Sequence, residues 1–196
     1  MASAVGRVVV GVSGSPSSLE ALRAAVDEAA RGRVELLAVT AWTPVGGEAG
    51  YRRAPCPELL GLWERQACAR LRNCFAEAFG GYPAGLAIRP LVVRAAPGPA
   101  LVGVADRPDD LLVVGAGERG WPARWFHGGT ARHCVAHAGC RVLAVPPPAL
   151  LAELPAWQRH RLPLVAPDEP AGARRQGPAL PSDPSDPSTR RLGEDL

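Results

Sequence analysis

The feature that most constrains the fold is a series of short apolar runs separated by segments with helical periodicity. The runs have the length of strands and occupy residues 7–12, 34–42, 86–94, 110–115 and 141–145. Runs such as RVVVGV and DLLVVG are continuously apolar, which is typical of strands that are buried on both faces. Apolar spacing and end signals predict helices between them, over residues 16–32, 58–79, 97–104 and 130–138.

Strands and helices that alternate in this way predict an α/β fold with a doubly wound, five-stranded parallel sheet and helices on both faces. If the runs 7–12 and 110–115 are neighbours, the strand order is 3-2-1-4-5, with its reversal between them. Pro90 indicates an edge position for the third strand, because proline donates no ladder hydrogen bond. Ligands of such sheets bind at the carboxyl ends of the strands beside the reversal. Here that place is formed by residues 13–15 and 116–129.

Two segments are expected to lack regular structure. Residues 43–57 contain three prolines and three glycines, which predict a loop. The domain is expected to span residues 1–148, because residues 149–196 are rich in proline and include SDPSDPSTRR, which has no apolar periodicity. Such a segment buries too little surface to offset the entropy of ordering, so we predict a mostly disordered tail.

The composition excludes several classes of protein. The net charge is +3 and lysine is absent, so the 22 basic residues are all arginines, and they are scattered along the chain. Nucleic-acid binding favours basic residues that gather on one face, so we expect no nucleic-acid partner. No apolar run reaches the roughly 18 residues of a membrane span, and the N-terminus lacks an apolar signal core. The five cysteines are interpreted as free thiols, which are typical of a reducing compartment, so we expect a cytoplasmic protein. Because no membrane span is predicted, we also expect no membrane contact.

Known catalytic motifs of α/β proteins do not fit this chain. GVSGSP has a serine after a strand, but not the Gly-x-Ser-x-Gly of a nucleophile elbow. A phosphate loop needs lysine, and the first strand is not followed by Gly-x-Gly-x-x-Gly. No nucleophile, base and orienting acid come together, so we predict that the protein is not an enzyme.

A cluster of histidines and cysteines in the last third has the composition of a metal site. His133 and His137 lie one helical turn apart, and His127, Cys134 and Cys140 are near them in the sequence. This spacing could bind zinc. Cysteines of this kind also pack well as small hydrophobic residues, and no carboxylate follows in a metalloprotease pattern. We therefore favour a packing role and expect no metal.

Four segments, VVVGVSGSPSSLEALRAAVDEAA, VELLAVTAW, DLLVVGAGERG and GGTARHCVAHAGCRVLAVP, resemble the universal stress protein family. The resemblance covers residues 6–147, although the third strand and the long helix match in pattern only. It implies an α/β nucleotide-binding fold, a dimeric state and a regulatory role in the stress response. Some members of this family bind ATP and others do not.

The resemblance also implies site residues. In ATP-binding members, a Gly, two residues, Gly, nine residues and Gly-Ser or Gly-Thr pattern follows the fourth strand. Carried over to this chain, the pattern implies that the phosphates are lined by Gly115, Gly117, Gly128, Gly129 and Thr130. The base and ribose would be flanked by Ser13 and by the Thr40 to Trp42 end of the second strand, and Gly14 is a further candidate binding residue. Glycines let a backbone approach phosphate, and the unpaired amides of a helix start favour an anion.

Three positions depart from the family pattern. Glu118 stands where a glycine is expected, Gly129 where Ser or Thr is expected, and Ser13 where an acidic residue is usual. We therefore expect ATP, together with Mg²⁺, to bind weakly or conditionally. The alternative is a nucleotide-free dimeric interaction module of the same fold.

The last strand, RVLAV, is apolar and lies at an edge in the predicted strand order. An unguarded apolar edge tends to be paired. Universal stress proteins are similar in that they dimerise through their last strand. We therefore predict a homodimer joined through Arg141 to Val145.

Overall fold

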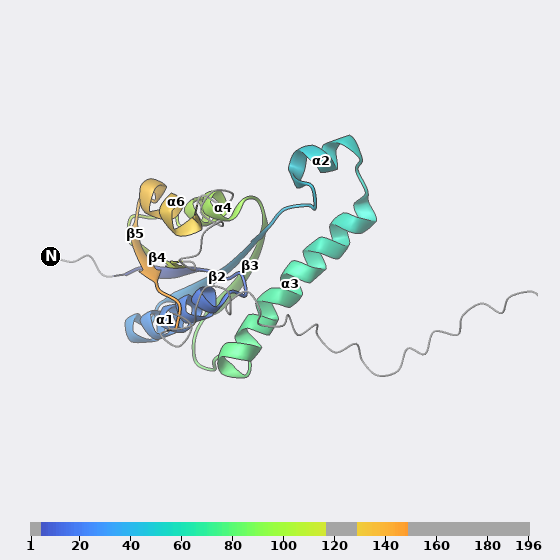
Figure 1. Ribbon diagram of the computed structural model, residues 1–196. Helices are drawn as coiled ribbons and strands as arrows, with labels where there is room; N and C mark the ends of the chain where they lie inside the picture. The colour runs from blue at the N-terminus through green and yellow to red at the C-terminus, as the bar shows by residue number, and fades with distance from the viewer. Residues whose placement is uncertain (1–4, 117–128, 149–196) are drawn as a thin grey trace, which may run out of the picture. The chain divides into compact units, whose positions relative to one another are not determined.

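The computed structural model describes residues 5–116 and 129–148. The predicted tail, residues 149–196, lies outside the described residues, and its disorder stays a prediction. Strands and helices alternate along the chain, as Figure 1 shows. The elements are β1 (Arg7–Gly11), α1 (Pro16–Gly32), β2 (Glu35–Trp42), α2 (Gly47–Arg53), α3 (Pro57–Phe79), β3 (Ile88–Arg94), α4 (Pro97–Val104), β4 (Asp110–Gly115), α6 (Thr130–His137) and β5 (Arg141–Val145).

The five strands form one parallel sheet in the order β3-β2-β1-β4-β5, which confirms the predicted topology. β1 pairs with β2 on one side and with β4 on the other, so the strand order reverses between β1 and β4. Pro90 lies on the edge strand β3, opposite Ala38 in register. The carboxyl ends of β1 and β4 therefore leave the sheet side by side.

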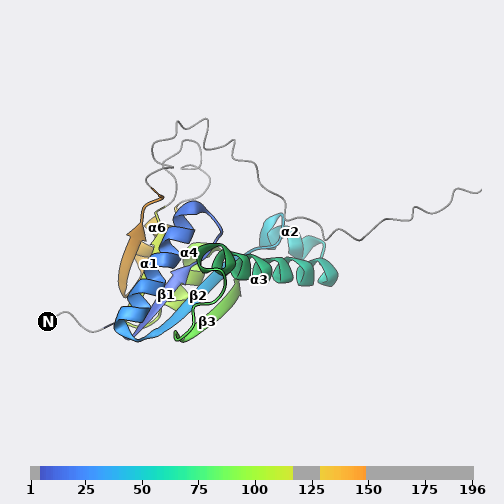
Figure 2. The same ribbon diagram turned by 90° about the horizontal axis from the view of Figure 1, so that it is seen from below.

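Helices cover both faces of the sheet, as the two views in Figures 1 and 2 show. α1 and α3 pack on one face, where Phe75 is fully buried together with Val8 and Val10 of β1. α4 and α6 pack on the other face, where Leu101 meets Val9 of β1. Successive residues of one strand thus enter two different cores, which explains why its sequence is continuously apolar rather than alternating.

Residues 43–57 were predicted to form a loop, and this is wrong because they contain helix α2. The sequence of α2, GEAGYRR, includes two glycines, and none of its residues is buried. Contacts with a distant strand hold it: Arg94 of β3 donates two hydrogen bonds of 2.8 Å to Glu48. The Arg94 guanidinium also lies 4.8 Å from the centre of the Tyr51 ring. Tertiary contacts of this kind override weak helix propensity and are not visible in a local pattern.

Helix α3 buries only the second half of its predicted apolar face. Its buried residues begin at Ala67, whereas Leu59 remains 44% exposed. In Figure 1, α2 and the first half of α3 extend away from the sheet. The periodicity therefore predicted the helix and its C-terminal end correctly. It did not reveal how far the helix extends beyond the sheet.

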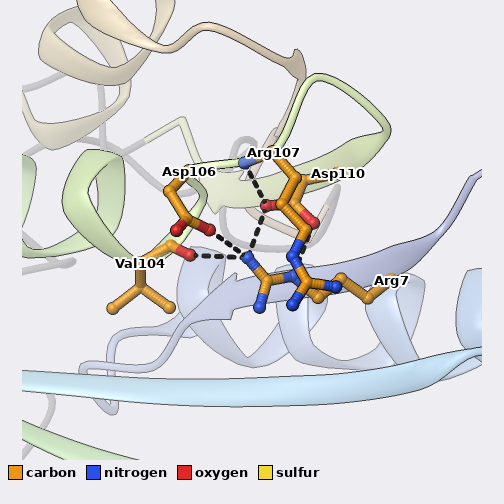
Figure 3. A network of polar contacts seen from close by, with 5 residues as sticks. All are labelled: Arg7, Val104, Asp106, Arg107 and Asp110. Atoms are coloured by element: carbon orange, nitrogen blue, oxygen red, sulfur yellow. Dashed lines mark hydrogen bonds and ion pairs between the residues drawn. The ribbon is translucent and has the colours of Figure 1, made fainter.

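A charged network joins the amino ends of β1 and β4 (Figure 3). Arg7 and Asp110 are direct partners in the strand register, and Arg7 donates hydrogen bonds of 2.6 and 2.9 Å to the Asp110 carboxylate. Asp110 is fully buried and also accepts a 3.1 Å hydrogen bond from the backbone amide of Arg107. Arg7 donates in addition to Asp106 and to the Val104 carbonyl.

The hydrogen bonds to Asp110 raise the pKa of Arg7, and this effect exceeds the opposing effect of burial. The Arg7 guanidinium therefore stays charged over the range in which the protein is folded. The network thus fixes the register of β1 and β4 at their amino ends. The carboxyl ends of the same two strands form the candidate site.

Candidate functional site

A cavity of about 480 Å³ lies at the carboxyl ends of β1 and β4. This is the place where open α/β sheets bind ligands, and the volume suits a small molecule. The walls come from the ends of β1, β2 and β4 and from the starts of three helices, α1, α4 and α6. The two loops that the sequence placed at the strand reversal thus contribute to one cavity.

The cavity brings together four of the predicted site residues, Ser13, Gly115, Gly129 and Thr130. Gly117 and Gly128 lie outside the described residues, as does Glu118. Gly14 and Thr40 are described, but neither is among the residues that line the cavity.

Thr40 and Gly14 each lie in the chain between two residues that line the cavity. The Thr40 hydroxyl is fully buried and donates a 3.0 Å hydrogen bond to the Val12 carbonyl, which ties β2 to the chain leaving β1. Gly14 has φ of +86°, a conformation that glycine adopts readily and other residues rarely do. A β-carbon at Gly14 would lie 3.9 Å from Cγ of Arg70, so this turn rests against α3.

Hydroxyl groups gather on the α1 side of the cavity. Ser15 caps α1, and its Oγ accepts a 3.3 Å hydrogen bond from the amide of Ser18. The Ser18 hydroxyl in turn accepts from the amide of Ser13 at 2.8 Å. The Oγ atoms of Ser13 and Ser15 are 3.2 Å apart, and those of Ser15 and Ser17 are 3.3 Å apart. Because hydroxyls both donate and accept, the cluster offers adaptable hydrogen bonds to a polar ligand.

The start of α6 supplies unpaired donors and a positive charge. The first backbone bond of this helix runs from the His133 amide to the Gly129 carbonyl at 3.0 Å, so the amides of residues 130–132 have no acceptor within the helix. Arg132 also lines the cavity, and it makes no hydrogen bond or ion pair within residues 5–116 and 129–148. Among the described lining residues there is no carboxylate. The site therefore favours an anion.

Gly115 is required by packing as well as by the family pattern. A β-carbon at this position would lie 2.7 Å from the backbone carbonyl atoms of Ser17, closer than real contacts allow. The end of β4 can therefore approach α1 only because residue 115 is glycine.

Sequence reasoning missed Arg132, Ser17 and Ser18 as lining residues. The signals were present, because SPSS opens a helix beside the reversal and Arg132 occupies the first turn of α6. Any side chain in the first turn of a helix that starts at the carboxyl edge of the sheet is a candidate for this lining.

His133 and His137, which follow this turn, pack against each other. The rings of His133 and His137 stack with centroids 4.3 Å apart, and the His133 carbonyl is 2.9 Å from Nδ1 of His137. Cys134 is fully buried, and burial raises the pKa of its thiol. No group of three or more potential metal ligands occurs in the part of the chain that the structure describes. His127 lies outside it.

The family model described as the universal stress protein family matches residues 5–146. The chain belongs to the universal stress protein family. The fold and the sequence resemblance given above agree with this assignment. A comparison with curated proteins returned no match. None of the helices within the described ranges is long and apolar enough to cross a membrane.

Solved structures of the same family are similar to this universal stress protein. One, a universal stress protein in complex with cAMP, is 31% identical, with 73% of this chain and 98% of that chain covered and a TM-score of 0.48. UspA from Lactobacillus plantarum is 22% identical, with 73% and 99% covered and a TM-score of 0.57. The protein from Archaeoglobus fulgidus in complex with dAMP is 20% identical, with 73% and 99% covered and a TM-score of 0.43.

Proposed function

We propose that this universal stress protein is a non-enzymatic, cytoplasmic regulator in a stress response that binds an adenine nucleotide in the cavity between β1 and β4. The observation that carries the proposal is the lining of that cavity. Three helix starts, a cluster of serine hydroxyls and Arg132 surround it, without a carboxylate among the described residues. Such a lining attracts a phosphate group, because unpaired amides and a guanidinium bind anions strongly.

The two sides of the cavity suit the two halves of a nucleotide. The amides of residues 130–132, the Thr130 hydroxyl and Arg132 would hold the phosphates. Val39, Ala41 and Leu101 give an apolar wall for the base. Mg²⁺ would bind through the phosphates, since the described lining has no carboxylate to hold it.

The replacement of an acidic residue by Ser13 gives a physical reason for weak binding. A hydrogen bond to a neutral hydroxyl contributes about 1 kcal/mol less than one to a charged group, which corresponds to roughly fivefold in affinity. Gly129 removes a further hydroxyl from the family pattern. Regulation by nucleotide is then restricted to high nucleotide concentration.

The same lining supports a role other than catalysis. The described lining residues include no histidine, cysteine, aspartate or glutamate. A serine hydroxyl without an adjacent base is a poor nucleophile, so the cluster at Ser13 to Ser18 is suited to binding.

Thermal unfolding with and without Mg-ATP tests the proposal. A ligand present at about 100 times its Kd stabilises the folded state by about 2.7 kcal/mol, which raises Tm by roughly 5–10 °C in a domain of this size. Arg132→Ala should reduce this shift. Arg72→Ala removes the same charge from the exposed side of α3, outside the lining, and should retain it.

An unchanged Tm at millimolar Mg-ATP, in a protein that unfolds cooperatively, would favour the second candidate, the nucleotide-free dimeric module. One observation supports it independently. β5 is an edge strand of the sheet, and its Leu143 is 37% exposed. An apolar edge of this kind is available for pairing with a second copy. Light scattering should give a dimer for the parent protein and a monomer for Leu143→Lys, and equal masses would refute the interface.

A further inference from the structure

A second cavity adjoins the first at the carboxyl end of β2. Its volume is about 300 Å³, and it shares Ala41 and Pro97 with the larger cavity. Its remaining wall comes from the chain that follows β2 and from α3. A ligand that fills the larger cavity therefore has a neighbouring space into which it can extend.

Two tryptophans, Trp42 and Trp63, line the smaller cavity. Neighbouring side chains position both rings. Tyr51 of α2 meets the Trp63 ring edge-on, with centroids 6.5 Å apart, and the Arg94 guanidinium lies 5.9 Å from the Trp42 ring centre. Trp42 is only 8% exposed, so the half-buried Trp63 is the ring that can stack on a planar aromatic ligand, and every nucleobase presents such a face.

Arg70 connects the smaller cavity with the turn after β1. It lines the smaller cavity, and its Cγ lies 3.9 Å from where a β-carbon on Gly14 would stand. Gly14 is flanked by Ser13 and Ser15, which line the larger cavity. Arg70 makes no hydrogen bond or ion pair within the described ranges, so its charge is available to an anion. Arg132 provides a second such charge in the larger cavity.

We propose that the smaller cavity is a subsite for a second base, and that the ligand is a dinucleotide with two bases joined by phosphates. This inference rests on the proposed function. One base and the adjoining phosphates occupy the larger cavity, the linking phosphates pass Arg70, and the second base stacks on Trp63. A mononucleotide leaves the smaller cavity unused, so the two-base ligand binds more tightly.

Calorimetric titration of the 196-residue chain with ATP and with diadenosine tetraphosphate tests the subsite. Diadenosine tetraphosphate adds a second adenosine and one phosphate to ATP, and adenosine tetraphosphate, with four phosphates and one adenosine, is the control for the added phosphate. Stacking of one base strengthens binding by about fivefold or more, whereas the presence of two equivalent ends accounts for only a factor of two. The parent protein should therefore bind the dinucleotide at least fivefold more tightly than ATP.

Variants on α3 locate the effect. Trp63→Ala should remove the preference for the dinucleotide and leave the Kd for ATP unchanged, whereas Trp63→Phe should retain most of the preference. Arg70→Ala should weaken binding of the dinucleotide, while Arg72→Ala on the same helix should not. Circular dichroism and Tm verify that each variant is folded.

The outcomes separate this inference from the proposed function. If ATP binds and the dinucleotide binds equally well, the subsite is wrong and the nucleotide site stands. A preference that persists in folded Trp63→Ala also overturns the subsite. If neither ligand binds, both proposals are wrong.

Discussion

Removal of the Asp110 carboxylate should destabilise the protein strongly, although Asp110 lies far from the cavity in the strand register. The side chain is fully buried and holds Arg7 through two hydrogen bonds of 2.6 and 2.9 Å. The Arg7 side chain itself is only 12% exposed. In Asp110→Ala the guanidinium therefore keeps its charge in a place that water hardly reaches.

The magnitude follows from this burial. Removal of one partner of a buried ion pair costs about 3–5 kcal/mol. Arg7 retains its contacts with Asp106 and with the Val104 carbonyl, so we expect the lower end, about 3 kcal/mol. At roughly 2–4 °C per kcal/mol, Tm should fall by roughly 6–12 °C.

Urea denaturation at neutral pH measures the loss, and Asp106→Ala is the matched control. Asp106 binds the same guanidinium, but its side chain is 66% exposed, so its removal should cost about 1 kcal/mol or less. Since the pKa of Arg7 is raised, the stabilisation that its charge contributes is fully present below the ordinary arginine pKa and is lost only as pH rises through the raised value. The loss in Asp110→Ala should therefore not vary between about pH 6 and pH 9. Equal effects of the two substitutions would refute the argument from burial.

Three further outcomes follow from the structure. Gly115→Ala forces a β-carbon to within 2.7 Å of the α1 backbone and should destabilise the protein by about 1–3 kcal/mol in urea, whereas Gly103→Ala, with open space around the new carbon, should not. The hydrogen bond from β3 lowers the pKa of Glu48, so the α2 contact is present above pH 4.5 and is lost as pH falls through the lowered pKa. Tryptophan fluorescence should show this acid transition in the parent and not in Glu48→Gln. Burial raises the pKa of the thiols of Cys74, Cys134 and Cys140, and Cys74 and Cys134 are also buried, so iodoacetamide should label these two last in the native protein, as mass spectrometry would show. Equal labelling of all five cysteines would contradict the buried positions of Cys74 and Cys134.

Much of the fold could be predicted from the sequence because its signals are local. Continuous apolar runs marked the strands, Pro90 marked an edge, and helical apolar spacing with end signals marked α1. Helix α2 could not be predicted, because its stability comes from Glu48 meeting a strand residue 46 positions away.

The candidate site was predictable in position but not in all its residues. The rule for parallel sheets brought Ser13 and Gly115 to one cavity, although they are far apart in the sequence. It did not reveal that Thr40 is turned inward, because every residue from 36 to 40 is buried and the run carries no alternation to separate its two faces. Arg132 was missed because the glycine pattern of ATP-binding members ends before it.

The most direct test of the nucleotide site is an NMR titration of the isotope-labelled protein with AMP. We predict that the largest amide shift changes fall on residues 13–18 and 129–132, the two segments that line the cavity from α1 and α6. These changes should saturate with a single Kd and should weaken in Arg132→Ala. Saturable binding of AMP that leaves both segments unchanged and perturbs another part of the chain would contradict the account.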